Sequence, residues 1–400
     1  MNKNIGVLWL IILIDLIGFG LTTPSFPLVL KQMNADPFWL TFAGPGVYSL
    51  FQLVFTPIWG RLSDAYGRRP ILMLSMLGAF ISYLMMAQAD SVGMLIATRA
   101  LGGIMSGNIG AAFAYVADVS EPKNRAKSIG ILSSAFGLGF MLGPLIGGPL
   151  GTMGGLEISL RWPGYVAAAL SALAFLGTVF LLRESLEPAN RKPLGAKADK
   201  STGSPLAILR SRPALVSIVS TTLLLGIAAA MMQSVYPIWA ADTHGHDSKW
   251  VGIAFAVLAS MAVVAQAGLV GLLAKRVGER SVAILGVLAF SLGLAIISFV
   301  HQPLALWPGL VMLGLGLGLS NPAFTSLASF QASPQERGAV MGVVQSGSSL
   351  GRVLGPALSG PIYVGLSHAG PFVLATLLCL PALWLILKVP EPTQGARSAH

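Results

Sequence analysis

Long apolar stretches separated by short polar turns dominate the chain. A helix needs about 20 mainly apolar residues to cross a hydrocarbon core about 30 Å thick. Stretches of this kind recur through the whole sequence and leave no room for a soluble domain. We therefore predict an all-α membrane protein with twelve transmembrane helices, at 5–28, 39–60, 71–89, 92–117, 126–150, 160–182, 213–240, 249–272, 282–300, 303–328, 338–363 and 368–388.

The composition supports this interpretation. Charged residues make up 10% of the chain, whereas a soluble protein carries about 25%. This excludes a soluble enzyme, a nucleic-acid-binding protein and a disordered protein. The single cysteine, Cys379, excludes a disulfide framework. The sequence also lacks the phosphate-binding loop of nucleotide-driven proteins, so we expect no cofactor and no use of ATP as the energy source.

Lysine and arginine are distributed unevenly between alternate loops. Twenty fall on one side of the predicted helices, three fall on the other, and Arg99 and Arg352 lie inside spans. Basic loops stay in the cytoplasm, so we predict a multi-pass membrane protein with cytoplasmic termini. The long polar loop rich in Pro, Gly and Ser predicts a flexible linker. The expected domains are a first bundle at 1–183, a linker at 184–212 and a second bundle at 213–400.

The two halves of the chain resemble each other. Residues 125–150 align with 337–362 at a shift of 212, with ten of 26 positions identical. The loop at 60–70 aligns with 271–281 at a shift of 211, which pairs Gly67 with Gly278 and Arg69 with Arg280. Six helices restore the orientation of the chain, so the repeat is parallel and predicts two pseudo-symmetric six-helix bundles. Such repeats build transporters whose site lies between the halves.

Several motifs resemble the major facilitator superfamily. The loop GRLSDAYGRRP (60–70) looks like the family's signature after helix 2, and RALGGIMSG (99–107) resembles its helix 4 pattern. GLGFMLGPLIGG (137–148) looks like the helix 5 pattern of exporters that act as antiporters. Asp15 and the run YVADVSEPKNRAKSIG (115–130) are similar to the tetracycline/proton antiporters and related drug exporters. The resemblance implies the major facilitator fold and drug export driven by a proton gradient across the bacterial inner membrane.

The chain departs from that group at several positions. Ala65 follows the loop aspartate where the family usually has Arg, and Ser82 stands where an acid is expected in helix 3. Ala262 replaces the His of tetracycline exporters, although Gln266 is kept. The resemblance therefore does not single out tetracycline as the substrate.

Two charged residues inside the spans are candidates for proton coupling. Asp15 lies about ten residues into helix 1, which is near the membrane midplane. A carboxylate there must face water, a partner or a proton, so it could exchange a proton for a substrate. The alternative is a permanent ion pair, for instance with Arg99. We expect Arg99 to modulate the acid; alternatively, it reaches toward the outer interface.

The loop and helix 5 motifs suggest conformational roles. We expect Asp64 to face the N-terminus of helix 11 near 333–337, where the helix dipole favours an anion, and Arg68 or Arg69 to pair with Asp118. General membrane packing and the positive-inside rule are the alternatives. The glycines and proline of helix 5 predict a tight contact with a helix of the other half. The predicted loop and gate residues are Gly60, Asp64, Gly67, Arg68, Arg69, Asp118 and Arg125, and the antiporter helix contributes Gly139, Gly143, Pro144, Gly147 and Gly148.

Polar and aromatic residues on several helices predict a mostly apolar cavity for amphiphilic molecules. The candidates for substrate binding are Phe19, Thr22, Gln52, Asn108, Gln233, Tyr236, Gln266, Asn321, Phe324, Gln345 and Arg352. We predict a monomeric proton-coupled antiporter that exports lipophilic drugs, with lipids, protons and a small lipophilic substrate as its partners and no nucleic acid. The alternative is a proton-coupled symporter or a facilitator for a sugar or organic acid, and a sensor or scaffold without transport activity is a further possibility.

Overall fold

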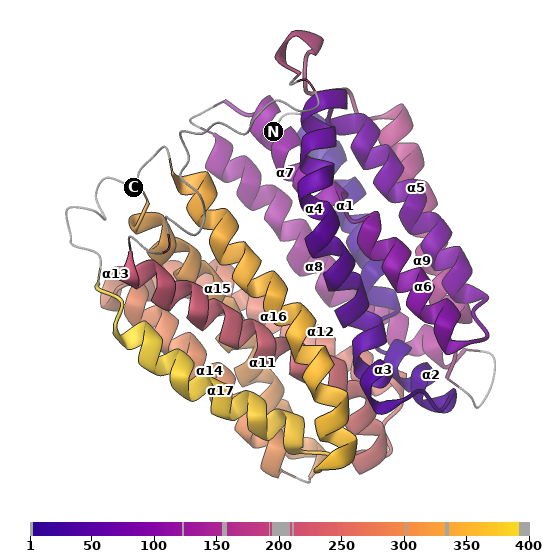
Figure 1. The fold of residues 1–400 in the computed structure, drawn as a ribbon, viewed down its shortest axis with the longest axis vertical. Coiled ribbons are helices and arrows are strands. Elements are labelled where there is room, and N and C mark those ends of the chain that lie inside the picture. Colours follow the sequence, from indigo (N-terminus) through magenta and orange to yellow (C-terminus); the bar gives the residue numbers. More distant parts are fainter. Residues whose placement is uncertain are drawn as a thin grey trace. The chain divides into compact units, whose positions relative to one another are not determined.

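A computed structural model describes residues 3–121, 124–153, 158–191, 193, 209, 212–300, 302–332 and 336–391. Every regular element in these ranges is a helix (Figure 1). The chain forms two compact units, one of Met1–Ala196 with Ala240–Ala256 and one of Lys197–Trp239 with Val257–His400. The predicted all-helical fold is confirmed, and the predicted domain boundaries stay a prediction.

The first unit contains the helices up to the linker. They are α1 (Lys3–Leu21), α2 (Phe26–Gln32), α3 (Pro37–Thr41), the π-helical turn η1 (Phe42–Gly46), α4 (Val47–Tyr66), α5 (Arg68–Ala87), α6 (Val92–Ile104), α7 (Asn108–Val119), α8 (Arg125–Gly151), α9 (Arg161–Phe180) and the short η2 (Pro188–Asn190).

The second unit contains most of the remaining helices, while the end of α11 and the start of α12 belong to the first unit. The helices are α11 (Pro213–His244), α12 (Ser248–Val264), the π-helical turn η3 (Ala265–Leu269), α13 (Val270–Val277), α14 (Glu279–Phe299), η4 (Pro303–Ala305), α15 (Leu306–Phe330), α16 (Arg337–Gly365) and α17 (Gly370–Leu387).

Eleven helical segments of the described chain are long and apolar enough to cross a membrane. The remaining predicted span, 338–363, forms α16, which has 29 residues but a more polar sequence that includes Gln345, Ser346 and Arg352. Helix α5 shows the pattern of a membrane helix: Leu74, Leu77 and Ile81 are exposed along one face while the opposite face is buried. An apolar face that is exposed in the folded chain suits contact with lipid.

Several predicted continuous helices are interrupted. The first span breaks at 22–25 between α1 and α2, where Pro24 and Pro27 disfavour regular helix. The fourth breaks at 105–107 between α6 and α7, and the second and eighth contain the π-helical turns η1 and η3. Hydropathy averaged over a whole span does not reveal these breaks, because each one involves only three to five residues within a longer apolar stretch.

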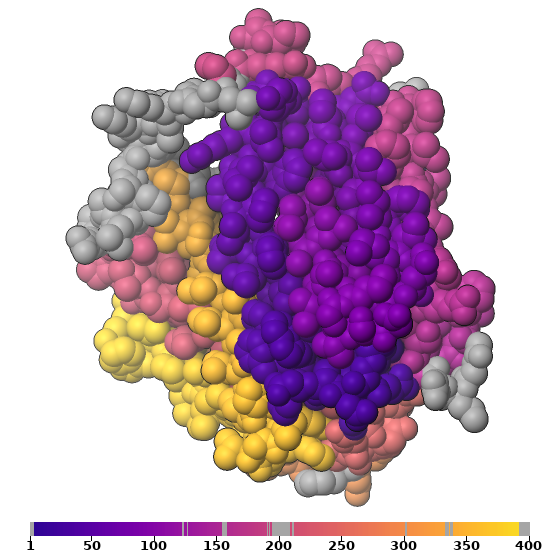
Figure 2. Space-filling view, turned by 45° about the vertical axis from the view of Figure 1, so that its right-hand side comes forward, coloured from indigo at the N-terminus to yellow at the C-terminus, as the bar shows by residue number. Residues whose placement is uncertain are grey.

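The core of the first unit lies around α1. Leu8, Ile12 and Leu16 of this helix are buried against residues such as Leu72 of α5 and Tyr115 of α7. Helices α8 and α9 pack along α1, and α9 also packs on α5. In the space-filling view the indigo and magenta segments of this unit form a continuous, closely packed surface (Figure 2).

The internal repeat has a structural counterpart. Gly67 ends α4 with a φ of 107°, and its aligned partner Gly278 ends α13 with a φ of 86°. Positive φ is accessible to glycine at little cost. Arg69 Nη2 donates to Val179 O, and Arg280 Nη2 donates to Leu387 O, both at 2.5 Å. In each unit the aligned arginine thus binds a carbonyl at the C-terminal end of its last long helix.

Candidate functional site

The break between α6 and α7 sets up the first site. A helix break leaves backbone groups without partners, and in a membrane these must be satisfied inside the protein. Ser75 Oγ donates to Met105 O and accepts from Asn108 N, the latter at 3.1 Å. Trp59 Nε1 donates to Ile104 O. Side chains of α4 and α5 thereby hold the broken ends, and Asn108 becomes the first residue of α7.

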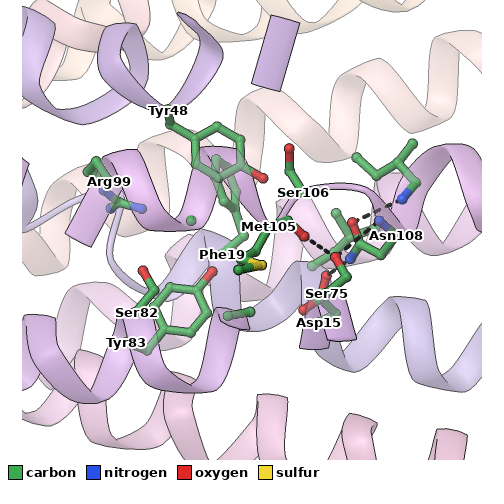
Figure 3. Close-up of a pocket in the computed structure, with 14 residues that line it drawn as sticks. Asp15, Phe19, Tyr48, Ser75, Ser82, Tyr83, Arg99, Met105, Ser106 and Asn108 are labelled. Atoms are coloured by element: carbon green, nitrogen blue, oxygen red, sulfur yellow. Dashed lines mark hydrogen bonds between the residues drawn. The ribbon is translucent and has the colours of Figure 1, made fainter. Parts of the chain in front are cut away.

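Asp15 of α1 meets Asn108 at this break. Asn108 Nδ2 donates to Asp15 Oδ2 at 2.5 Å, and Asp15 is only 9% exposed. Figure 3 shows the two side chains together with Ser75 on one side of a pocket. No cation forms an ion pair with Asp15 within the described ranges. The predicted alternative of a permanent Asp15–Arg99 pair is therefore not what the structure contains.

The pocket beside Asp15 has a volume of about 40 Å³. This is room for a few water molecules, since one water needs about 10–15 Å³ by the same measure. Of the predicted residues, Asp15, Phe19, Arg99 and Asn108 line it. Sequence reasoning missed the polar residues Tyr48, Ser75, Tyr83 and Ser106, and noted Ser82 only as a departure from the family. Serines and tyrosines inside predicted spans are the signal that could have identified them.

Arg99 of α6 lies in the same pocket and is only 6% exposed. Its Nη2 donates to Thr22 Oγ1 at 2.7 Å, and its Cζ lies 4.4 Å from the centre of the Phe26 ring. Its Nε is buried without a hydrogen-bond partner. The predicted alternative, in which Arg99 reaches the membrane interface, is wrong because the residue is enclosed. Thr22 accepts this hydrogen bond, and its predicted contact with substrate stays a prediction.

The loop between α4 and α5 carries an ionic cluster. Arg68 Nη1 donates to Asp64 Oδ1 at 2.5 Å and to Ser63 Oγ at 3.0 Å, while its Nε donates to Asp118 Oδ2 at 3.1 Å. Ser185 Oγ also donates to Asp118 Oδ2, at 3.1 Å. The predicted pairing of Asp118 with Arg68 or Arg69 is confirmed, with Arg68 as the partner. The predicted approach of Asp64 to 333–337 stays a prediction, because residues 333–335 lie outside the described ranges.

Glu184 is a member of this cluster that sequence reasoning missed. Its Oε1 accepts from Arg68 N at 2.9 Å and its Oε2 accepts from Arg69 N at 3.2 Å. A carboxylate is favourable at the free N–H groups of a helix N-terminus. Gly67, which precedes α5, lies against the Glu184 side chain and has no room for a Cβ. Gly60 has open space around it, and Arg125 Nη2 donates to Ala117 O at 3.2 Å near the end of α7.

The predicted antiporter helix, α8, packs mainly on α1. A Cβ at Gly143 would lie 2.6 Å from Gly20 Cα, and one at Gly139 would lie 2.5 Å from Leu16 Cβ. Gly147 meets the backbone of Leu21, and Pro144 lies against Gly20. The prediction that these residues contact the other half is wrong for Gly139, Gly143 and Gly147, because their helix face is turned toward the helix that carries Asp15.

Gly148 and its surroundings do contact a helix from the second half of the sequence. Ser248 Oγ of α12 donates to Gly148 O at 2.8 Å, and a Cβ at Gly148 would lie 3.2 Å from Gly252 Cα. Lys31 at the end of α2 forms an ion pair with Asp242 at the end of α11. All of these residues belong to the first unit. The predicted tight contact is therefore present at Gly148.

A second cavity lies within the second unit and has a volume of about 500 Å³. Drug-sized molecules occupy pockets of about 300–1,000 Å³. Two predicted residues, Gln266 of η3 and Asn321 of α15, line it together. Sequence reasoning missed its other lining residues, Pro322, Thr325, Ser326, Ser329 and Phe330. Their spacing of three and four residues along one helix is the signal that could have indicated a shared face.

The remaining candidates lie outside both described cavities. Tyr236 and Phe324 are fully buried, which is typical of core packing. Gln52 is half-buried, whereas Gln233 and Gln345 are exposed. Arg352 donates to Ser348 Oγ at 3.2 Å and to Ser349 Oγ at 2.9 Å on its own helix. Their predicted roles in substrate binding stay predictions.

Comparisons with known proteins agree with this architecture. The family model of the Major Facilitator Superfamily matches residues 8–333 and, separately, 251–400. The chain is 31% identical to the class B tetracycline resistance protein of Escherichia coli, over 91% of this chain and 89% of that protein. It is 27% identical to the multidrug resistance protein MdtG of Klebsiella pneumoniae, over 99% of this chain and 95% of that one.

A solved structure shows the same fold. The crystal structure of the human organic anion transporter MFSD10 matches with a TM-score of 0.71 at 24% identity, over 96% of this chain and 99% of that chain. The helical fold, the membrane spans and these matches together define a membrane transporter rather than an enzyme. The chain belongs to the major facilitator superfamily, in the group that contains the tetracycline and multidrug resistance proteins.

Proposed function

We propose that this transporter exports lipophilic drugs, tetracycline-like or of several classes, from the cytoplasm in exchange for protons. The names of its relatives support drug export. The observation that carries proton exchange is the buried Asp15, which has an amide as its described partner and lines a pocket large enough for water. A buried acid with access to water can take up and release a proton.

The proposed cycle is alternating access between two bundles. The cavity of about 500 Å³ lined by Gln266 and Asn321 is the proposed drug site, because its size and its scattered polar groups suit an amphiphilic molecule. The Arg68 cluster is a proposed conformational lock, since it joins α4, α5 and α7 through ionic contacts that can break and re-form. The uneven distribution of basic residues supports an inner-membrane location with cytoplasmic termini.

Drug susceptibility tests this proposal. A host without its own pumps would express the chain and be challenged with a drug panel that includes tetracyclines, with and without a protonophore. We expect resistance to one or more lipophilic drugs and its loss with the protonophore. Resistance that survives the protonophore would contradict proton coupling, and a host with unchanged susceptibility to the whole panel would contradict drug export.

Measurements in vesicles test the direction of drug transport and the role of Asp15 in it. In inside-out vesicles with an acidic interior, addition of an exported drug should release protons, which a fluorescent pH probe would report. Asp15→Asn should remove this response, while Asp90→Asn, at an exposed aspartate, should preserve it. Movement of the drug in the same direction as the protons would instead indicate a symporter.

A further inference from the structure

Arg99 presents an unbalanced positive charge inside the first unit. A guanidinium stays protonated in proteins, and burying a charge without a counter-charge is costly, above all at membrane depth. The partners of Arg99 are the neutral Thr22 hydroxyl and the Phe26 ring. Among the described residues no carboxylate bonds to this guanidinium, because Asp15, the acid in the same pocket, binds Asn108 instead.

Further hydrogen-bond donors that an anion could accept from lie beside Arg99 in the pocket. The Nε atom is buried and has no partner. The tyrosines Tyr48 and Tyr83 line the same pocket, and Figure 3 shows them on the side of Arg99, with Asp15 on the other side. Ser82 also lies there, but its hydroxyl donates to Thr98 O at 2.7 Å. A guanidinium with nearby hydroxyl groups is a typical set of donors for an anion.

We propose that this pocket binds a small monovalent anion against the Arg99 guanidinium. Two sources share this chemistry: a free ion such as chloride, and a carboxylate carried by a transported molecule. The volume of about 40 Å³ admits a halide or a single carboxylate group but not the body of a drug. The anion supplies the negative charge that the protein does not place beside Arg99.

The position of Asp15 has a consequence for this site. Asp15 lines the same pocket as Arg99, together with the titratable Tyr48 and Tyr83. An ionised Asp15 repels an anion, whereas a protonated Asp15 does not. The anion therefore binds more tightly when Asp15 carries its proton, so that proton loading and anion binding favour each other.

Thermal unfolding of the purified protein tests the proposal without any transport assay. The protein would be kept in sodium gluconate, which is too large for the pocket, and titrated with sodium chloride, sodium bromide or sodium formate at constant ionic strength. A ligand that binds only the folded state raises the unfolding midpoint. We expect a saturable rise of about 2 °C or more for at least one of these anions.

Three variants make the result specific. Arg99→Gln removes the guanidinium, and Ser82→Asp places a carboxylate in the same pocket while keeping Arg99; both should abolish the response. The Ser82→Asp variant keeps the test valid if Arg99→Gln does not fold. Asp15→Asn removes the repelling charge, so the anion concentration at half-saturation should fall by at least about tenfold, which corresponds to about 1.4 kcal/mol or more.

The outcomes separate the two sources. A response to chloride or bromide identifies a free halide, and a response confined to formate identifies a carboxylate group, such as one on a transported molecule. Either result supports the site. A wild-type protein that responds to none of the three anions overturns the proposal. A response that persists in both Arg99→Gln and Ser82→Asp also overturns it, because the anions then act elsewhere.

Discussion

The side-chain amide of Asn108 donates to the carboxylate of Asp15 across 2.5 Å, although 93 positions separate the two residues. The contact depends on the break at 105–107, which starts α7 at Asn108, and on Ser75, which holds the broken backbone. If α6 and α7 formed one continuous helix, the residues that follow position 107 would be rotated differently about the helix axis, and Asp15 would face other side chains. The break therefore decides what the buried acid meets.

Replacement of Asn108 tests this relationship. Asn108→Leu removes the described donor to the Asp15 carboxylate, and an ionised group that loses such a bond is destabilised by about 1.5–3 kcal/mol. We expect proton-driven export to fall about tenfold, with normal amounts of protein in the membrane. Ser106→Ala is the matched control, because Ser106 lines the same pocket but donates only to Gly103 O. Equal activity of the two variants would contradict a role for the amide.

Arg68 should not tolerate replacement by lysine. Its Nη1 binds Asp64 and Ser63 while its Nε binds Asp118, and the single ammonium of lysine cannot reproduce this branched geometry. We expect Arg68→Lys to lower the transport rate several-fold, whereas Arg61→Lys, at an exposed arginine of α4, leaves it unchanged. Rates in vesicles, normalised to the amount of protein, provide the measurement. A fully active Arg68→Lys variant would show that charge alone is required.

Two glycines of α8 should respond in opposite ways to alanine. A Cβ at Gly143 would meet the Gly20 backbone at 2.6 Å, so α1 and α8 would have to separate. Overpacking of this kind costs about 1–3 kcal/mol, and we expect a lower unfolding midpoint for Gly143→Ala. Gly130 lies in the same helix with open space around it, so Gly130→Ala should be neutral or slightly stabilising. A Gly143→Ala variant as stable as Gly130→Ala would argue against the close contact.

The ion pair between Lys31 and Asp242 should contribute little to stability. The side chains are 45% and 16% exposed, and exposed pairs contribute about 0.2–1 kcal/mol. A double-mutant cycle with Lys31→Ala and Asp242→Ala should therefore give a coupling energy below about 1 kcal/mol that decreases at high salt. If the pair matters for transport, the reversed pair of Lys31→Asp with Asp242→Lys should recover activity lost in each single variant. A coupling energy of several kcal/mol would show that the pair is far better shielded from water than its exposed fractions indicate.

The fold and part of the site could be predicted from the sequence. The length of the apolar stretches gave the spans, because the thickness of the membrane fixes the length of a spanning helix. Asp15 and Arg99 were identifiable because charges inside spans are rare. The sequence alignment paired Gly67 with Gly278, and both adopt positive φ. Arg68 and Asp118 were predicted as a pair, although Glu184 was missed because no local pattern connects it to α5.

The sequence alone determined the features that depend on local composition: twelve helical segments, an internal repeat, and charges buried in apolar surroundings. Tertiary structure alone decided which groups those charges meet. Asp15 meets an amide, Arg99 meets a hydroxyl and an aromatic ring, and the α8 glycines lie against α1. The physical reason is that hydropathy does not specify the rotation of a helix about its axis or the position of a break in an apolar run. Those are set by packing between residues that lie far apart in the sequence.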